Sequence, residues 1–332
     1  MTVDRKIDTF DTKKNKRRIN HMEKRRLGTS NIEASIIGFG TWAAGGRGWG
    51  NVQKEEVKKT FVQAVEYGVN FFDTAPIYGR GESERVVGEA LKPYRDQIYI
   101  ATKCGLVWDN NGKMRKHNGK ESILREIDES LRRLQTDYVD LYQVHWPDPE
   151  TPIEETMEAL NLILESGKAR YVGVSNFSKD LIEQSLKLAP IVSLQSLYNI
   201  LERKVEKEEL PFVNEQEMGF IPYSPLAQGL LTGKFDASHQ IDEKDVRAMN
   251  PLFQLENLPR NVALVGQLKE IAKEYNRPVS QVAINWLLKK QGVSTVICGA
   301  KTVEQLQENV KASEWELANE HVQQIDSLIK EG

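Results

Sequence analysis

The sequence is poor in cysteine and contains no long apolar run. Its only cysteines are Cys104 and Cys298, which excludes a disulfide framework and favours a reducing cytoplasm. No segment approaches the roughly 18 consecutive apolar residues of a membrane-spanning helix, and no secretory signal sequence follows the start. The net charge of -3 means that the chain has no overall excess of positive charge of the kind that binds nucleic acid. We therefore expect a soluble cytoplasmic protein with neither a membrane nor nucleic acid as a partner.

Several common ligand-binding motifs are also missing. There are five histidines, none at H-x-x-x-H spacing, so we expect no metal site. Gly38 and Gly40 begin like a dinucleotide-binding fingerprint, but Ala43 stands where that motif needs its third glycine. A phosphate-binding P-loop is absent as well, because Gln228 and Phe235 occupy two of its defining positions. These absences argue against a doubly wound nucleotide-binding fold.

The first 21 residues differ in composition from the rest of the chain. This segment is basic and has almost no apolar periodicity; its clustered cations are Lys13, Lys14, Lys16, Arg17 and Arg18. Blocks of like charge are usually solvated tails, so we predict that residues 1–21 form a disordered extension. A localisation signal or a polyanion-binding tag is the functional alternative. We assign residues 22–332 to one folded domain.

From residue 35 onward, short β-branched and aromatic runs alternate with amphipathic helical patterns. The runs predict eight strands, over residues 36–39, 70–74, 98–102, 138–144, 171–174, 192–195, 220–223 and 295–298. Helical spacing is found at 55–67, 83–91, 122–134, 153–165, 181–188 and 320–330. Alternating strands and helices in this number predict a single-domain α/β protein, a (β/α)₈ TIM barrel. The long stretch at 225–258 departs from this rhythm and is expected to be a functional lid.

Ionisable side chains follow neighbouring strands of the predicted barrel. Asp73 and Tyr78 come after the second strand, Lys103 after the third, and His145 after the fourth. Active sites of such barrels lie at the carboxyl ends of the strands, so we expect these four side chains to converge at one mouth. Taken singly, each of them could be an ordinary turn or surface residue. Their successive placement favours a catalytic site.

This set of residues suits the reduction of a carbonyl group. Such a reaction needs a hydride donor and an acid that protonates the oxygen as negative charge develops on it. Tyr78 can be that acid, and the Lys103 ammonium can stabilise the tyrosinate. Asp73 is placed to keep a buried Lys103 charged, and His145 can orient the substrate oxygen. A hydrolase with paired carboxylates, such as Asp73 with Glu82 or Asp148, is an alternative, but it leaves Lys103 without a role.

Four short segments together resemble the signatures of a known family. They are FDTAPIYG at 72–79, TK at 102–103, VHW at 144–146 and GVSNF at 173–177. Over residues 24–330 the chain resembles the aldo-keto reductases of the bacterial type. It is also similar to the potassium-channel β-subunit branch of the family. The resemblance implies a catalytic tetrad of Asp73, Tyr78, Lys103 and His145.

The same resemblance implies a cofactor, NADPH rather than NADH, laid across the barrel mouth. By this resemblance, the nicotinamide would lie near Thr41, Trp42 and Asp73. Its carboxamide would be held by Ser175, Asn176 and Gln195, and its ring would stack on Tyr223. The segment 224–234 resembles a loop that covers the pyrophosphate, with cofactor-binding residues Ser224, Pro225, Leu226, Gln228 and Lys234, joined by the later Arg247. The segment 299–309 resembles the adenosine end, with Gly299, Gln305, Glu308 and Asn309, and with Lys301 facing a 2′-phosphate.

The substrate is expected to be a small carbonyl compound. Trp49, Trp108 and Trp146 fall in loops after predicted strands, so an aromatic-lined pocket for apolar or aryl carbonyls is a plausible interpretation, although tryptophans are also common core residues. The function indicated is NADPH-dependent reduction of aldehydes or ketones to alcohols. The alternative is a cofactor-binding regulatory protein of the same fold with slow turnover, and the presence of His145 favours the enzyme.

Overall fold

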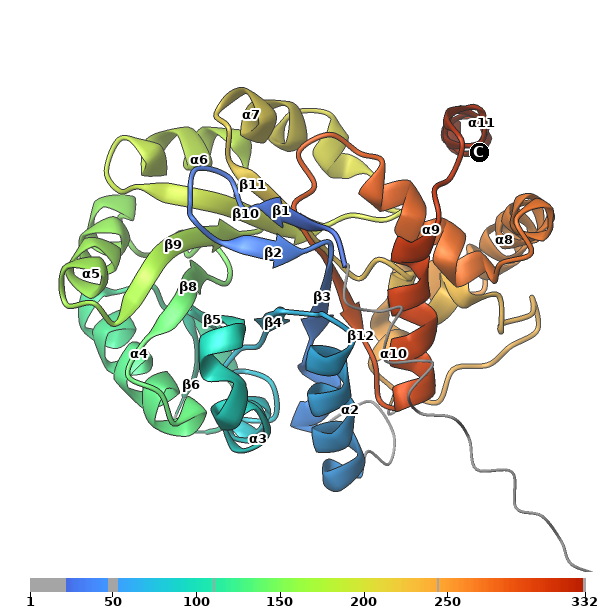
Figure 1. Ribbon diagram of the computed structural model, residues 1–332. Coiled ribbons are helices and arrows are strands. Elements are labelled where there is room, and N and C mark those ends of the chain that lie inside the picture. Colours follow the sequence, from blue (N-terminus) through green and yellow to red (C-terminus); the bar gives the residue numbers. More distant parts are fainter. Residues whose placement is uncertain (1–21, 47–52, 110, 244, 331–332) are drawn as a thin grey trace, which may run out of the picture.

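An eight-stranded parallel sheet closed into a barrel forms the centre of the computed structural model, which describes residues 22–46, 53–109, 111–243 and 245–330 (Figure 1). Around the sheet the order is β11-β10-β9-β8-β5-β4-β3-β12. The strands are β3 (Ile37–Gly40), β4 (Phe71–Asp73), β5 (Tyr99–Cys104), β8 (Val139–Val144), β9 (Ala169–Ser175), β10 (Ile191–Leu197), β11 (Gly219–Tyr223) and β12 (Val296–Gly299). A parallel bridge between Phe220 of β11 and Val293, three residues before β12, brings the two ends of the sheet together. All eight predicted strands and the (β/α)₈ barrel are confirmed.

The strands form because their residues are buried on both faces. All six residues of β8 are buried, and β5 and β10 have only one partly exposed residue each. One face of each strand points into the barrel and the other packs against the helices, which explains the nearly continuous apolar runs in the sequence. Polar residues appear mainly where a strand reaches the mouth, as Asp73 does at the end of β4.

Helices surround the barrel and cover its outer face (Figure 1). They are α2 (Lys54–Glu66), α3 (Glu82–Leu91), α4 (Lys120–Leu134), α5 (Ile153–Glu165), α6 (Lys179–Leu186), α7 (Glu209–Glu215), α8 (Leu258–Glu274), α9 (Val279–Leu288), α10 (Val303–Val310) and α11 (Asn319–Lys330). In α4, Ile123, Ile127, Leu131 and Leu134 form one buried stripe at helical spacing. The helix ends at Gln135, which adopts a left-handed conformation with φ 55°. The six helices predicted from periodicity agree with the structure within two residues at each end.

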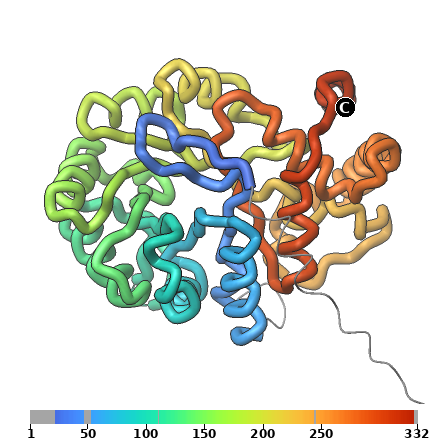
Figure 2. Tube along the Cα trace, in the orientation of Figure 1, coloured from blue at the N-terminus to red at the C-terminus, as the bar shows by residue number. Residues whose placement is uncertain are grey.

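A hairpin closes the amino-terminal end of the barrel. Its strands β1 (Lys24–Arg26) and β2 (Glu33–Ser35) pair antiparallel and cross the opening, as Figure 2 shows in blue. Leu27 and Ile32 between them are buried, and they pack in one cluster with Phe71, Ala101 and other residues of the barrel interior. The barrel is therefore open only at the opposite end, where the carboxyl ends of the strands lie.

Two excursions at the carboxyl-terminal end shape the mouth. A second hairpin, β6 (Leu106–Trp108) and β7 (Met114–Lys116), follows β5 directly. The segment expected to be a lid contains three short 3-10 helices, η4 (Ala227–Thr232), η5 (Val246–Met249) and η6 (Pro251–Phe253), and it buries Leu231, Phe235 and Phe253 against the protein. Its function as a lid stays a prediction. Among the described helices, none combines the length and the apolar character needed to cross a bilayer.

Candidate active site

Lys103 and Asp73 form a fully buried ion pair at the end of adjacent strands. The Lys103 ammonium is 2.9 Å from Asp73 Oδ1 and 2.7 Å from Oδ2, and it also donates to the carbonyl oxygen of Thr74 at 3.0 Å. The three N–H groups of the ammonium are thus all engaged. Burial lowers the pKa of Lys103, and the Asp73 carboxylate opposes that shift. The counter-ion role predicted for Asp73 agrees with this geometry.

Tyr78 lies between the ion pair and two other aromatic rings. Its ring centroid is 5.3 Å from Lys103 Nζ, 6.0 Å from the ring of His145 and 6.1 Å from that of Trp42. Burial, followed by the charge of Asp73, raises the pKa of Tyr78 well above 10. We expected the Lys103 ammonium to ease loss of the tyrosine proton, but its pairing with Asp73 leaves burial as the larger effect. Tyr78 therefore stays protonated over the whole physiological pH range.

His145 follows β8 and faces the ring of Tyr78 edge to face, with an interplanar angle of 86°. Burial, reinforced by the Lys103 ammonium, lowers its pKa well below the usual 6.5. The imidazole is consequently neutral at pH 7, and one of its ring nitrogens carries a proton that it can donate. The backbone of His145 is held by a hydrogen bond from its N–H to the carbonyl oxygen of Cys104, at 3.0 Å.

Two glutamines of the barrel interior converge on Asp73. Gln195 Nε2 donates to Asp73 Oδ1 at 2.8 Å, and Gln143 Nε2 approaches the same oxygen at 3.4 Å. Gln195 was expected at the nicotinamide carboxamide, so its contact with Asp73 was not foreseen. Gln143 was not identified from the sequence at all. Its position two residues before His145, as a polar residue near the carboxyl end of a buried strand, is the signal that could have revealed it.

The residues expected around the nicotinamide lie together at the mouth. Asn176, in a left-handed conformation with φ 61°, donates from Nδ2 to the carbonyl oxygen of His145 and to Ser175 Oγ, both at 3.0 Å. Its Oδ1 accepts from the Tyr223 hydroxyl at 2.9 Å. Thr41 Oγ1 donates to the carbonyl oxygen of Asp73 at 2.9 Å. This network fixes amide and aromatic groups beside the ion pair.

A second group of residues concentrates positive charge on the far side of the mouth. The pKa of Lys234 is lowered by burial and by its neighbours Arg247 and Lys301, and that of Lys301 is lowered by burial and Arg247. Asp245 compensates part of this charge, because it accepts from Arg247 Nε at 2.8 Å and Nη2 at 2.5 Å. Lys234 also lies close to Gly229, whose φ of 97° suits only glycine. Mutual repulsion of this kind is relieved by a bound anion, so these residues fit the phosphates of a nicotinamide cofactor.

The remaining expected cofactor residues are engaged in local hydrogen bonds. Asn309 Nδ2 donates to the Gly299 carbonyl at 3.1 Å, Gln305 Oε1 accepts from the backbone of Lys301 at 2.9 Å, and Glu308 accepts from Ser280 Oγ at 2.5 Å. In the segment 224–234, Gln228 Oε1 accepts from Asn250 Nδ2 at 3.2 Å, and the Ser224 carbonyl oxygen accepts from Asn199 Nδ2 at 3.0 Å. Pro225 and Leu226 are the next two residues of this segment. These contacts order both segments at the mouth.

Aromatic side chains border the site. Trp108 and Trp146 are each 38% exposed, which is unusual for large aromatic residues and consistent with the walls of a pocket. Trp49 and the basic extension 1–21 lie outside the described residues.

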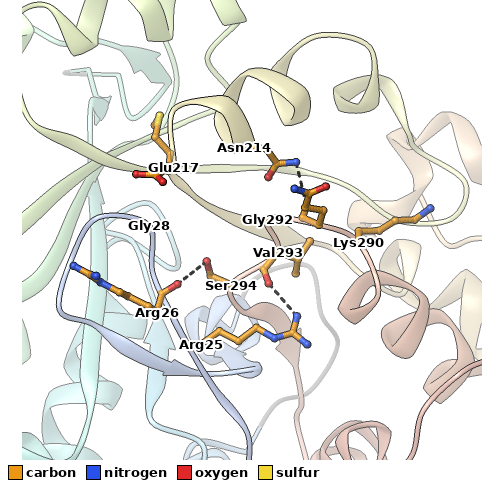
Figure 3. Close-up of a pocket in the computed structure, with 11 residues that line it drawn as sticks. Arg25, Arg26, Gly28, Asn214, Glu217, Lys290, Gly292, Val293 and Ser294 are labelled. Carbon is orange, nitrogen blue, oxygen red and sulfur yellow. Dashed lines mark hydrogen bonds between the residues drawn. The ribbon is translucent and has the colours of Figure 1, made fainter.

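A separate hollow of about 450 Å³ lies at the other end of the barrel (Figure 3). It is lined by Arg25, Arg26, Gly28, Asn214, Glu217, Met218, Lys290, Gln291, Gly292, Val293 and Ser294. Arg25 is bound to the Val293 carbonyl at 3.1 Å, and Lys290 is paired with Asp326 at 2.9 Å. None of the residues expected to be catalytic lines this hollow, so we do not assign the site there.

A (β/α)₈ barrel that gathers ionisable and aromatic side chains at the carboxyl ends of its strands is the architecture of a barrel enzyme. The family model described as the Aldo/keto reductase family matches residues 36–330, and the chain belongs to this family of oxidoreductases. The resemblance inferred from the sequence motifs is thereby confirmed.

Relatives with assigned names match nearly the whole chain. Aldo-keto reductase YhdN of Bacillus subtilis is 39% identical over 312 residues, covering 93% of this chain and 94% of the relative. The NADH-specific methylglyoxal reductase of Escherichia coli is 37% identical over 306 residues, covering 88% and 93%. The solved structure of the glycerol dehydrogenase AKR11B4 from Gluconobacter oxydans superimposes with a TM-score of 0.87 at 32% identity, covering 93% of this chain and 96% of that one.

Proposed function

We propose that this protein reduces aldehydes or ketones to alcohols with NADPH, and that Tyr78 donates the proton. The observation that carries the proposal is the buried Lys103–Asp73 ion pair beside Tyr78 and a neutral His145. Burying two charges is costly and does little for stability, so an ion pair of this kind at a barrel mouth points to chemistry rather than to structure.

In the proposed reaction, each residue has a defined task. A reduced nicotinamide, when bound, would supply the hydride. His145 donates its N–H to the carbonyl oxygen and orients it, since the imidazole is neutral. Tyr78 keeps its proton until negative charge develops on that oxygen, because burial and Asp73 raise its pKa. Lys103, 5.3 Å from the ring, stabilises the tyrosinate that forms, and Asp73 keeps Lys103 charged.

The cofactor would lie between two groups of residues already described. Asn176 and Tyr223 are suited to the nicotinamide, and Lys234, Arg247 and Lys301 to the phosphates. The concentration of cations favours NADPH, because its 2′-phosphate adds two negative charges. One relative carries the name of an NADH-specific enzyme, so both cofactors must be compared. Since Cys104 and Cys298 are free thiols, we infer that the protein acts in the cytoplasm.

The test is to follow the absorbance of the reduced nicotinamide while purified protein is offered methylglyoxal and a panel of aromatic aldehydes and ketones. Tyr78→Phe should bind NADPH as well as the wild type, measured by fluorescence titration, while kcat falls by about a hundredfold or more. Tyr94→Phe is the matched control, because Tyr94 lies just before β5 at the closed end of the barrel. It should keep wild-type turnover.

Two outcomes would contradict the proposal. Full turnover by Tyr78→Phe would show that another group donates the proton. Cofactor binding without turnover of any aldehyde or ketone, with either cofactor, would favour a cofactor-binding regulatory protein instead.

A further inference from the structure

We propose that this site takes carbonyl substrates that carry an anionic group, a carboxylate or a phosphate monoester, and that Arg80 and Lys116 bind this group. The inference rests on the reductase function proposed above and adds the chemical class of the substrate. It is carried by two cations beside the mouth that have no acidic partner among the described residues, each placed over an exposed indole.

The backbone directs the side chain of Arg80 to the mouth at an energetic cost. Arg80 lies two residues after Tyr78 and has a φ of 56°, between Gly79 at 65° and Gly81 at 83°. For a residue other than glycine, this left-handed conformation is unfavourable. Its guanidinium stacks 4.6 Å from the Trp108 ring, and Nη2 donates to the carbonyl oxygen of Gly112 at 3.2 Å. Backbone strain of this kind is typical of functional positions.

Lys116 is placed in a similar way on the second strand of the β6–β7 hairpin. Its ammonium lies 5.3 Å from the ring of Trp146, the residue directly after His145. Asn118, two residues further on, donates from Nδ2 to the carbonyl oxygen of Trp146 at 3.0 Å and so ties the end of the hairpin to the site. The ammonium is therefore held beside the residue that follows His145 in the chain.

Within the hairpin segment itself, basic residues outnumber acidic ones. Residues 106–118 contain Lys113, Arg115 and Lys116 but only one acid, Asp109, in a chain whose net charge is -3. Asp109 Oδ1 is already bound to the backbone N–H groups of Asn111 and Lys113. Across the described part of the chain, no carboxylate lies within 4.0 Å of the side-chain nitrogens of Arg80 or Lys116. Their donors can therefore bind an anion at the mouth.

Strand order separates these cations from those suited to the cofactor. The hairpin follows β5, and Lys234 follows β11, which is four places from β5 in a closed sheet of eight strands. Lys116 and Lys234 thus stand on opposite sides of the mouth, and Arg80, which follows β4, is three places from β11. An anion bound by Arg80 and Lys116 is on the substrate side.

The test compares aromatic aldehydes that carry a charged or an uncharged group at the para position. The specificity constant kcat/KM is measured with NADPH for 4-formylbenzoate, its methyl ester and 4-formylphenyl phosphate. The wild type should prefer the anions over the ester by about tenfold or more, the usual size of a charge-assisted hydrogen bond. The two anions distinguish carboxylate from phosphate recognition. Because exposed charges are screened by salt, the preference should shrink at high ionic strength.

Substitutions then assign the preference to residues. Arg80→Gln and Lys116→Gln should each lower the ratio of anion to ester by about fivefold to tenfold, and Arg80→Lys, which keeps the charge, should retain part of it. Arg115→Gln is the matched control, since Arg115 is exposed and alternates to the other face of the same strand. It removes an equal charge and should leave the ratio unchanged. A wild-type ratio near one, or a preference that survives both substitutions, would overturn the inference.

A binding measurement separates this inference from the reductase function. The alcohols 4-(hydroxymethyl)benzoate and its methyl ester are titrated against the intrinsic tryptophan fluorescence in the presence of NADP⁺. Tighter binding of the anion, lost in Arg80→Gln, would support the anion site even if no aldehyde were reduced. Equal binding of the two alcohols would overturn it while leaving the proposed reductase activity intact.

Discussion

Replacing Asp73 by Asn should destabilise the protein through Lys103, and the size of the effect can be worked out from the burial of the pair. Lys103 is 0% exposed and depends on Asp73 for its counter-charge. A buried charge that loses its partner costs about 3 to 5 kcal/mol. Releasing the proton at pH 7 costs a similar amount, about 4 to 5 kcal/mol, because the pKa of a free lysine is about 10.4 and each pKa unit is about 1.4 kcal/mol.

The origin of this loss can be recognised from its pH dependence. In Asp73→Asn, the pKa of Lys103 in the folded state falls far below its unfolded value, so the unfolded chain binds one more proton. The free energy of unfolding should then rise with pH, by about 1.4 kcal/mol per unit between pH 7 and 10. The deficit relative to the wild type should shrink from about 4 to 5 kcal/mol at pH 7 to about 1 to 2 kcal/mol at pH 9.5. Urea unfolding followed by circular dichroism at both pH values measures it.

Asp140→Asn is the matched control for this experiment. Asp140 is also buried, at 1% exposure, and it accepts from Arg95 Nη2 at 2.7 Å. A guanidinium keeps its charge throughout this range, so the deficit of Asp140→Asn should not shrink as pH rises. A deficit of Asp73→Asn that is equal at pH 7 and pH 9.5 would refute the argument that Lys103 is its source.

Two further predictions concern the cofactor and a buried carboxyl group. Lys301→Glu should lower the preference for NADPH over NADH by about tenfold or more. The control Lys311→Glu, at the end of α10, should leave this preference unchanged. An undiminished preference in Lys301→Glu would refute a contact between Lys301 and the 2′-phosphate. Burial raises the pKa of Glu126 to about 7, so its ionisation costs stability as pH rises from the unfolded value through 7. Glu126→Gln should therefore stabilise the protein by up to about 3 kcal/mol at pH 8 and by about 1 kcal/mol or less at pH 5. Thermal unfolding measures the effect, and an unfolding temperature at pH 8 no higher than that of the wild type would contradict the prediction.

The barrel strands could be predicted because burial on both faces leaves a strong apolar signal. Helix α8 was missed although Val265, Leu268 and Ala272 follow helical spacing. Other missed elements lack such a signal for physical reasons. All residues of β7 are exposed, so its pairing with β6 has no apolar pattern. Helix α9 has the opposite problem, because all ten of its residues are buried and no periodicity of 3.6 remains. The hairpin of β1 and β2 consists of strands of three residues each, too short for alternation to be recognised.

Those residues of the candidate site could be predicted whose place in the barrel follows from their position in the sequence alone. Asp73, Lys103 and His145 end or follow strands, and in a parallel barrel the carboxyl ends of all strands meet at one mouth, so sequence position is enough to bring them together. Contacts that depend on side-chain direction were not accessible in this way. The donation from Gln195 to Asp73 and the stacking of Arg80 on Trp108 each join residues at least 28 positions apart. No pattern along the chain encodes either contact.

The structure also changes the way in which Lys103 can act on Tyr78. All three N–H groups of the ammonium point to Asp73 and Thr74, so the ammonium acts on the tyrosine only through its electric field, over 5.3 Å to the ring. The adjacent carboxylate cancels much of that field, and the pKa of Tyr78 is accordingly raised by burial and by Asp73. A tyrosine of this kind does not lose its proton to solvent, yet it can still protonate a developing alkoxide, which is a stronger base than tyrosinate. In the proposed reaction, proton transfer therefore waits for charge to build on the substrate oxygen, and the same burial that keeps His145 neutral also keeps Tyr78 protonated until that moment.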